Sequence, residues 1–191
     1  GKRVVIVGAG YIGIEVAEAF VNRGVLPVVL DHADHPLTIL DADMGARVAA
    51  EMRALDIDLR LGVDVIGFDD GVVHTSAGDL PADVMIAGLG ITPNTSLARD
   101  AGLELGVKGS IVVDERMATS APGVWAAGDC VQSRHLVTGE AVHIALGTYA
   151  NRQARVAGIN IAGGEAVFPG VLGTAITRIG TTEIAVTGVT E

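Results

Sequence analysis

Residues 3–31 read RVVIVGAGYIGIEVAEAFVNRGVLPVVLD, and this stretch decides the fold class. Residues 3–7 are short, continuous and rich in β-branched side chains, which is typical of a strand buried on both faces. Apolar residues recur at helical spacing over residues 10–22, and Gly24 is a signal for the end of a helix. Residues 27–31 predict a second strand. The order strand, turn, helix, strand predicts two parallel strands joined by a right-handed crossover.

The turn at residues 8–13 fits the pattern GxGxxG. Gly8 permits a tight turn, Gly10 lets a pyrophosphate approach the backbone because it has no Cβ, and Gly13 lets the helix press on the strand. The free N–H groups and the positive end of the helix would then hold the phosphates. We therefore predict that NAD(H) is bound by Gly8, Ala9, Gly10, Tyr11, Ile12 and Gly13. The alternative is a glycine turn that serves packing alone.

Asp31 ends the second strand, 18 residues after Gly13. A carboxylate at this place accepts hydrogen bonds from the adenosine ribose diol and repels a 2′-phosphate. The next residues, His32 to His35, read HADH and include no Arg or Lys that could receive such a phosphate. The sequence therefore favours NADH over NADPH.

The rest of the chain predicts a mixed α/β protein with a small antiparallel layer. In the first half we expect a helix from residue 41 or 43 to about 55, a strand at 58–61, hairpin strands at 63–68, 71–75 and 80–81, and a buried strand at 84–89. After a turn at 91–94 we expect one helical turn at 97–101, strands at 111–113 and 124–127, a long helix at 143–162 and a last strand at 183–189.

Composition narrows the classes of function. The formal charge is −10 and the isoelectric point about 4.8, which excludes a basic nucleic-acid surface. Hydrophobic residues make up 49% of the chain, enough for a buried core. The longest apolar stretch, residues 4–14, is shorter than the ~20 residues that a bilayer span needs, and no signal peptide is recognisable. We therefore predict a cytoplasmic protein.

Other catalytic patterns are missing from the sequence. Cys130 is the single cysteine and has no CxxC partner, so a small buried side chain is favoured over a nucleophile. The five histidines have no recognised metal-ligand spacing, and no metal site is predicted. No Ser-Tyr-Lys set supports an ordinary single-domain dehydrogenase.

Several segments together resemble the FAD-dependent pyridine nucleotide-disulfide oxidoreductases, in particular the branch of NADH oxidases and CoA-disulfide reductases. They are GAGYIGIEVAEAF (8–20), VVLD (28–31), AGLGITPN (87–94), GVWAAGDC (123–130), IALGTYANRQARVAGINIAGG (144–164) and PGVLGTAITR (169–178). They occur in the order of the family, and the resemblance extends over essentially the whole chain.

The resemblance implies a domain organisation. Residues 1–96 would form a Rossmann-like NAD(H)-binding domain, residues 97–168 the C-terminal half of an FAD-binding domain, and residues 169–191 the start of an interface domain that forms a homodimer. The sequence lacks the N-terminal half of the FAD domain, which would carry the first Gly-rich turn and the redox cysteine. We therefore expect a fragment with no catalytic residue of its own; a natural short protein is the alternative.

The resemblance also implies roles for single residues near the nicotinamide cofactor. Tyr11 would lie at the flavin face and move when nicotinamide enters, and Glu15 would lie near the nicotinamide end of the pocket. Val65 would pack on adenine, and Gly90 would let the nicotinamide half pass close to the backbone. The alternatives are a Tyr11 that only covers the turn, a solvated Glu15 and a Val65 that belongs to the core.

For FAD, the resemblance implies a second group of residues. Asp129 would bind the ribityl chain; the alternative is an ordinary turn or N-cap residue. The segment Ala145, Leu146, Gly147 and Thr148 would approach the isoalloxazine ring.

The function implied is an NADH-binding part of a flavoenzyme. Hydride would pass from NADH to FAD and then to a small-molecule disulfide, a persulfide or O₂. We expect the isolated chain to bind NADH, to hold little or no FAD and to be inactive. We also expect a dimer or rearranged packing across residues 108–191. The alternative is a free-standing module that responds to NAD by binding a partner.

Overall fold

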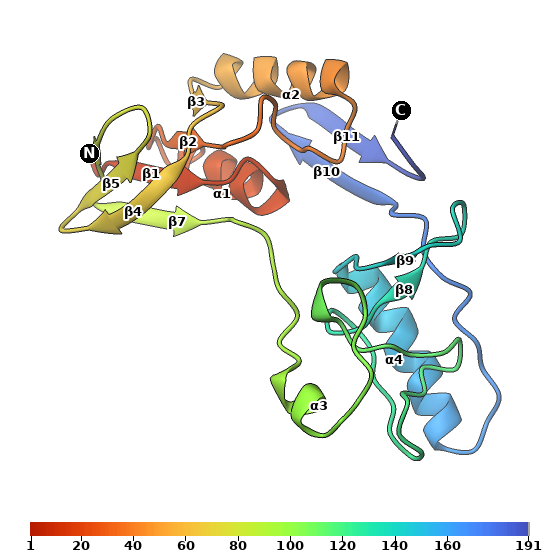
Figure 1. The fold of residues 1–191 in the computed structure, drawn as a ribbon. Helices are drawn as coiled ribbons and strands as arrows, with labels where there is room; N and C mark the ends of the chain where they lie inside the picture. The colour runs from red at the N-terminus through yellow and green to blue at the C-terminus, as the bar shows by residue number, and fades with distance from the viewer. Residues whose placement is uncertain (191) are drawn as a thin grey trace. The chain divides into compact units, whose positions relative to one another are not determined.

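The computed structural model describes residues 1–190, and Figure 1 shows the order of the helices and strands along them. Contacts divide the chain into two compact units. Residues 1–90 and 175–186, with residue 190, form the first unit. Residues 91–174 and 187–189 form the second unit.

The first unit is built on a parallel sheet with the strand order β3-β2-β1-β7. The strands are β1 (Val4–Val7), β2 (Val28–Leu30), β3 (Asp58–Arg60) and β7 (Val84–Ala87). Helix α1 (Tyr11–Val21) connects β1 to β2, and α2 (Ala42–Ala54) connects β2 to β3. β1 and β2 pair in parallel from Val5 with Val28 to Val7 with Leu30. The predicted α/β fold class and its parallel crossover are therefore confirmed.

The two faces of this sheet are covered by different layers. Val4 and Ile6 point into a core shared with α1 and α2, whereas Val5 and Val7 pack with Val73. Val73 belongs to a three-stranded antiparallel sheet of β4 (Val65–Asp69), β5 (Val72–Thr75) and β6 (Leu80–Pro81). Strand β1 is buried on both faces, because α1 and α2 cover one face and the antiparallel layer covers the other. The predicted antiparallel layer is confirmed.

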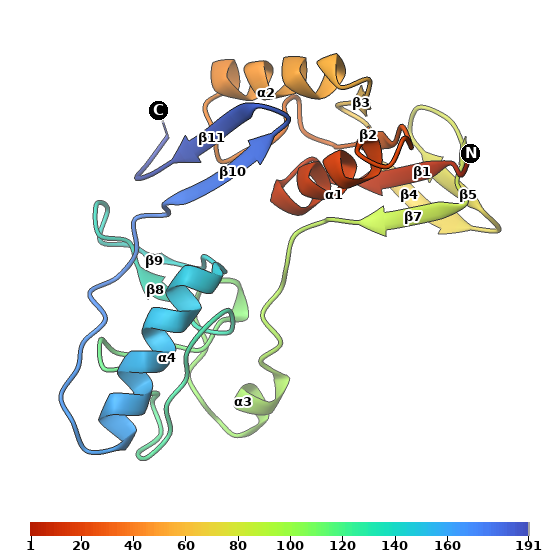
Figure 2. The same ribbon diagram turned by 180° about the vertical axis from the view of Figure 1, so that it is seen from behind.

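A hairpin from the end of the chain completes the first unit. Strands β10 (Ala175–Ile179) and β11 (Thr182–Val186) pair with each other and pack on α1 and α2. Both views of the ribbon show α2 running along this hairpin (Figures 1 and 2). Ile179 and Ile184 lie in the same buried cluster as Ile14 and Met52. The expected interface domain at 169–191 stays a prediction, and its hairpin shares the buried core of the first unit.

The second unit has little regular structure. It contains α3 (Ser96–Asp100), a 3₁₀ turn η1 (Val107–Gly109), the short strands β8 (Ser133–Arg134) and β9 (Ala141–Val142), and α4 (Gly147–Ile161). Its buried cluster is centred on Met117, Tyr149 and Phe168. The rings of Tyr149 and Phe168 meet edge to face with centroids 6.5 Å apart.

Two expectations for this unit are wrong. Residues 111–113 and 124–127 form isolated bridges instead of strands, because their backbone groups bond to nearby loops; the amide of Ile111, for example, donates to the carbonyl of Cys130. The long helix begins at Gly147 rather than His143, because residues 141–142 are used as β9 and Leu146 is still extended.

Over residues 1–190, no α-helix combines the length and the apolar character that a passage through a bilayer demands. The predicted cytoplasmic location and homodimer stay predictions.

Candidate functional site

Close backbone contacts constrain the turn between β1 and α1. Gly8 has φ +102°, a conformation that favours glycine, and a Cβ there would collide with the carbonyl of Gly88. A Cβ on Gly13 would collide with the carbonyl of Gly8. The amide of Gly8 donates to the carbonyl of Leu30 at 2.7 Å, which fixes the turn to the end of β2. Both glycines are therefore required by close backbone contacts, as the motif predicts.

Gly10 is different, because no atom lies within 4 Å of the place where its Cβ would be. Its φ of −80° and ψ of −171° are open to any residue, so neither conformation nor packing inside the chain explains a glycine here. Gly10 is also the N-cap of α1, and no side chain caps the helix. No acidic residue lies in the first turn either, so no side chain of α1 offsets the N–H groups and the positive end of the helix. This arrangement suits a phosphate.

Asp31 follows β2 and is tied to the same turn. Its Oδ2 accepts the amide of Ala9 at 2.6 Å, and its Oδ1 accepts the amide of Ala33 at 2.9 Å. A carboxylate has about four lone-pair sites, so two amide contacts leave room for a hydroxyl pair. His32 Nδ1 lies 3.3 Å from Oδ1 of Asp31. The carboxylate predicted to bind a ribose therefore also holds the glycine turn in shape, a role that the sequence analysis missed.

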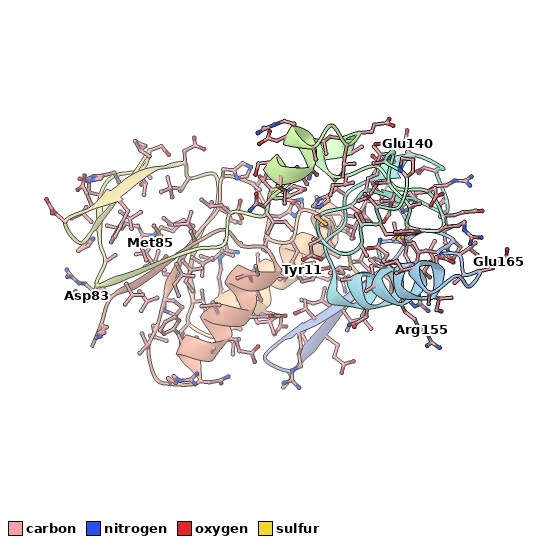
Figure 3. The ribbon with its side chains drawn as sticks, turned by 90° about the horizontal axis from the view of Figure 1, so that it is seen from below. Tyr11, Asp83, Met85, Glu140, Arg155 and Glu165 are labelled. Carbon is pink, nitrogen blue, oxygen red and sulfur yellow. The ribbon has the colours of Figure 1, made fainter. Side chains whose placement is uncertain are left out.

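The other residues predicted to contact NAD(H) lie in the same unit. Tyr11 lies at the start of α1 (Figure 3). Its side chain is half-buried, and this burial raises the pKa of its hydroxyl. Ile12, the next residue of α1, is exposed. Gly90 has φ +85° and open space around its missing Cβ. Val65 packs with the cluster of β1, β2 and β5, which agrees with the core alternative, although adenine contact stays untested. Glu15 is exposed, and its Oε1 accepts the hydroxyl of Thr177 at 3.2 Å.

The residues predicted to contact FAD lie in the second unit. Asp129 is exposed in a loop, and its carbonyl accepts Nε2–H of His143 at 2.7 Å. Ala145 and Leu146 are half-buried, and Gly147 and Thr148 form the exposed start of α4. α4 has no side-chain cap and no acidic residue in its first turn, so its N-terminus also suits a negatively polarised group.

Gln153 holds the Asp129 loop, and sequence reasoning missed it. Its side-chain oxygen accepts the amide of Gly128 at 2.8 Å, and its Nε2 donates to the hydroxyl of Ser133 at 2.9 Å. The residue is 2% exposed. The sequence does contain a signal for this role. Gln153 lies four residues from both Tyr149 and Ala157, so its polar side chain lies on the buried face of α4, where it needs hydrogen-bond partners.

The structure of residues 1–190 shows neither a cluster of metal ligands nor a second cysteine near Cys130. Among residues 1–190, no group of three or more His, Cys, Asp or Glu side chains is placed to hold a metal ion. Cys130 is half-buried, and its Sγ contacts the carbonyl of Ala127 at 3.5 Å. That no metal is needed stays a prediction.

Comparison with known proteins points to one family. The sequence profile described as pyridine nucleotide-disulphide oxidoreductase matches residues 1–157. A relative from Pyrococcus furiosus, named NAD(P)H sulfur oxidoreductase (CoA-dependent), is 40% identical over 98% of this chain and 43% of its own length.

Solved structures give the same result. An NAD-dependent persulfide reductase from A. fulgidus matches 98% of this chain and 36% of its own, with 40% identity and a TM-score of 0.94. The water-forming NADH oxidase from Lactobacillus brevis, bound to NADH, matches 99% of this chain and 43% of its own, with 29% identity and a TM-score of 0.93. The chain thus spans less than half the length of the proteins that it resembles.

Proposed function

Because the chain belongs to the pyridine nucleotide-disulphide oxidoreductase family, we propose that it supplies the NADH-binding part of a flavin-dependent oxidoreductase. Residues 8–13 and Asp31 bind the pyrophosphate and the adenosine ribose of NADH. The whole enzyme uses the hydride of NADH to reduce a disulfide, a persulfide or O₂ through FAD. These acceptors agree with the names of the relatives, which act on sulfur, persulfide or oxygen.

The observation that carries this proposal is the open space at Gly10. A glycine that meets no neighbour and has an ordinary conformation is unexplained by packing, which was the alternative for this turn. The space lies at an uncapped helix N-terminus, and Asp31 bonds to the amide of Ala9 in the same turn. A diphosphate joined to a ribose is the ligand chemistry that uses the N–H groups and the carboxylate together.

The residues of the second unit fit part of an FAD site. Asp129 and residues 145–148 offer an exposed carboxylate and the N-terminus of α4, and FAD bound there would supply the two-electron acceptor for hydride. The sequence contains one cysteine, Cys130, without a CxxC partner, and a single GxGxxG turn. We therefore expect this chain alone to bind NADH without turnover and to hold little FAD.

In this proposal Tyr11 helps to position the nicotinamide and does not transfer a proton. The half-buried ring of Tyr11 covers the start of α1. The role of the protein is to hold the nicotinamide in a fixed orientation.

The proposal is tested by titrating the 191-residue chain with NADH and following nucleotide fluorescence. In Gly10→Val the side chain fills the open space, and we expect affinity to fall by at least about thirtyfold because the phosphates lose their approach to the amides.

Gly67→Val is the matched control, because Gly67 lies in the same unit and also has open space around its missing Cβ. Circular dichroism checks that both variants are folded. Unchanged affinity in a folded Gly10→Val would place the nucleotide elsewhere and refute the proposal.

A further inference from the structure

We propose that Leu37 is a positioning residue, whose backbone N–H directs the amide of Gly10 toward the pyrophosphate of NADH. This inference rests on the proposed binding of the pyrophosphate at residues 8–13. It goes further by assigning a role to a residue that lies outside the glycine motif, in the loop that follows β2. Leu37 acts through the peptide bond between Ala9 and Gly10.

Both backbone polar groups of Ala9 are held by this loop. The N–H of Ala9 donates to Oδ2 of Asp31 at 2.6 Å, and its carbonyl accepts the N–H of Leu37 at 3.0 Å. Ala9 is fully buried, so neither group depends on water for a partner. The loop therefore fixes the orientation of the peptide bond that leads into Gly10.

The direction of the Gly10 N–H follows from this contact. The peptide bond between Ala9 and Gly10 is trans, so its carbonyl and its N–H point in opposite directions. Because the carbonyl points at Leu37, the N–H of Gly10 points away from it. Among residues 1–190 this N–H has no acceptor, and no atom lies within 4 Å of the place of the missing Cβ. The contact with Leu37 thus leaves one more donor free for a phosphate oxygen.

Leu37 makes this contact in a backbone conformation that leucine rarely adopts. Its φ is +51°, in the left-handed region that favours glycine and asparagine. Its side chain is 3% exposed and belongs to the buried cluster of α1 and α2, and its carbonyl accepts the N–H of Leu40 at 2.8 Å. Strain of this kind persists only where the surrounding structure imposes it. The fold therefore holds the N–H of Leu37 at Ala9 against the local preference of the backbone.

A residue that serves packing alone would behave differently on substitution. Leu37→Met keeps an unbranched side chain of similar volume. Leu37→Ile has the same atoms as leucine but is β-branched, and a positive φ is a severe outlier for such a residue. Leu37→Gly loses the packing but adopts this φ without strain. Packing predicts that the glycine variant is the most impaired in binding, whereas positioning predicts that the isoleucine variant is.

The experiment titrates the 191-residue chain and the three variants with ADP-ribose and with adenosine, which lacks the pyrophosphate. Heteronuclear NMR measures both dissociation constants and follows the amide signal of Gly10. Urea unfolding ranks the stability of the variants, and Leu37→Met is the matched control.

We expect Leu37→Ile to bind ADP-ribose about tenfold more weakly than Leu37→Met, the effect of one hydrogen bond to a charged group. Its affinity for adenosine should stay unchanged. Leu37→Gly should be the least stable variant and yet bind ADP-ribose more tightly than Leu37→Ile. In the natural chain the amide proton of Gly10 should shift downfield with ADP-ribose and not with adenosine.

Three results would overturn the inference and leave the proposed function intact: ADP-ribose affinities in the order of stability, an equal loss for adenosine, or a Gly10 signal that ignores bound ADP-ribose. If Leu37→Ile or Leu37→Gly fails to fold, the hydroxy acid analogue of leucine at position 37 decides, because it removes the N–H and keeps the side chain. It should weaken ADP-ribose binding about tenfold, and an unchanged affinity would count against Leu37. If the natural chain binds no ADP-ribose, the proposed function fails, and this inference with it.

Discussion

Replacing Asp31 by alanine should destabilise the first unit even without nucleotide. The carboxylate accepts two backbone amides, from Ala9 at 2.6 Å and Ala33 at 2.9 Å, and its side chain is only 13% exposed. Hydrogen bonds to a charged group contribute about 1.5–3 kcal/mol each. Because Ala9 is fully buried, its amide would also lose a partner that water cannot easily replace. We expect Asp31→Ala to lower the free energy of unfolding by about 2–4 kcal/mol.

The assay is urea unfolding of the 191-residue chain, followed by far-ultraviolet circular dichroism. Asp34→Ala is the matched control, because it removes the same charge three residues later from a side chain that is 93% exposed. Its free energy of unfolding should change by less than about 0.5 kcal/mol. Asp31→Asn keeps one acceptor oxygen but turns an amide group toward a second N–H, so it should fall between the other two variants.

Equal stability of Asp31→Ala and Asp34→Ala would refute the idea that Asp31 holds the glycine turn. Asp31 would then act on the nucleotide alone, and its loss would weaken NADH binding at unchanged stability. If the idea is correct, both quantities fall in the same variant. NADH binding by Asp31→Ala must therefore be measured in the absence of denaturant, where the chain is still folded.

Two further predictions concern side chains outside this turn. His74 bonds to Asp69 and to Asp79, both at 3.0 Å, and these bonds raise the pKa of the imidazole above its usual 6.5. This stabilisation is complete below pH 6.5 and disappears as pH rises through the raised pKa, so the melting temperature of the natural chain should exceed that of His74→Gln by more at pH 5.5 than at pH 8.5. Gln153→Met should leave the amide of Gly128 without its acceptor and lower the free energy of unfolding by about 1–3 kcal/mol, whereas Gln153→Glu should retain the acceptor; hydrogen exchange at Gly128 should accelerate in the methionine variant alone.

The sequence was a sufficient guide where a short segment determines its own structure. The strand, turn and helix of residues 4–21 follow from β-branched runs, helical spacing and three glycines within one stretch. The antiparallel layer also follows from local signals, because Asp-Gly turns fix the hairpin at residues 65–75.

The sequence analysis predicted no strand at residues 175–179, where the packing partners are distant and the hydrophobic pattern is misleading. In β10, Ile176 is 74% exposed while the neighbouring Thr177 is buried. The hydrophobic pattern would therefore predict the wrong face of this strand to be buried. The hairpin is oriented by Ile179, which enters the core beside α1 and α2. More than 100 residues separate α2 from β10 in the sequence. The sequence of residues 175–186 therefore does not indicate that this hairpin packs on α1 and α2.

The same contrast explains why the glycines of the candidate site could be assigned before its side chains. Gly13 is required because a Cβ there would strike the carbonyl of Gly8, a contact set within residues 8–13. Gly8 is assigned by the same motif, although its Cβ would strike Gly88, which directly follows β7. Glu15 lies in the same helix turn, yet its carboxylate bonds to Thr177, 162 residues away. The motif therefore specifies the backbone of the turn, whereas the role of a charged side chain beside it depends on which distant segment packs against it. Asp31 and Glu15 are both acids near the same turn, but their carboxylates have different partners. The role of each must therefore be tested by its own substitution and not inferred from the family.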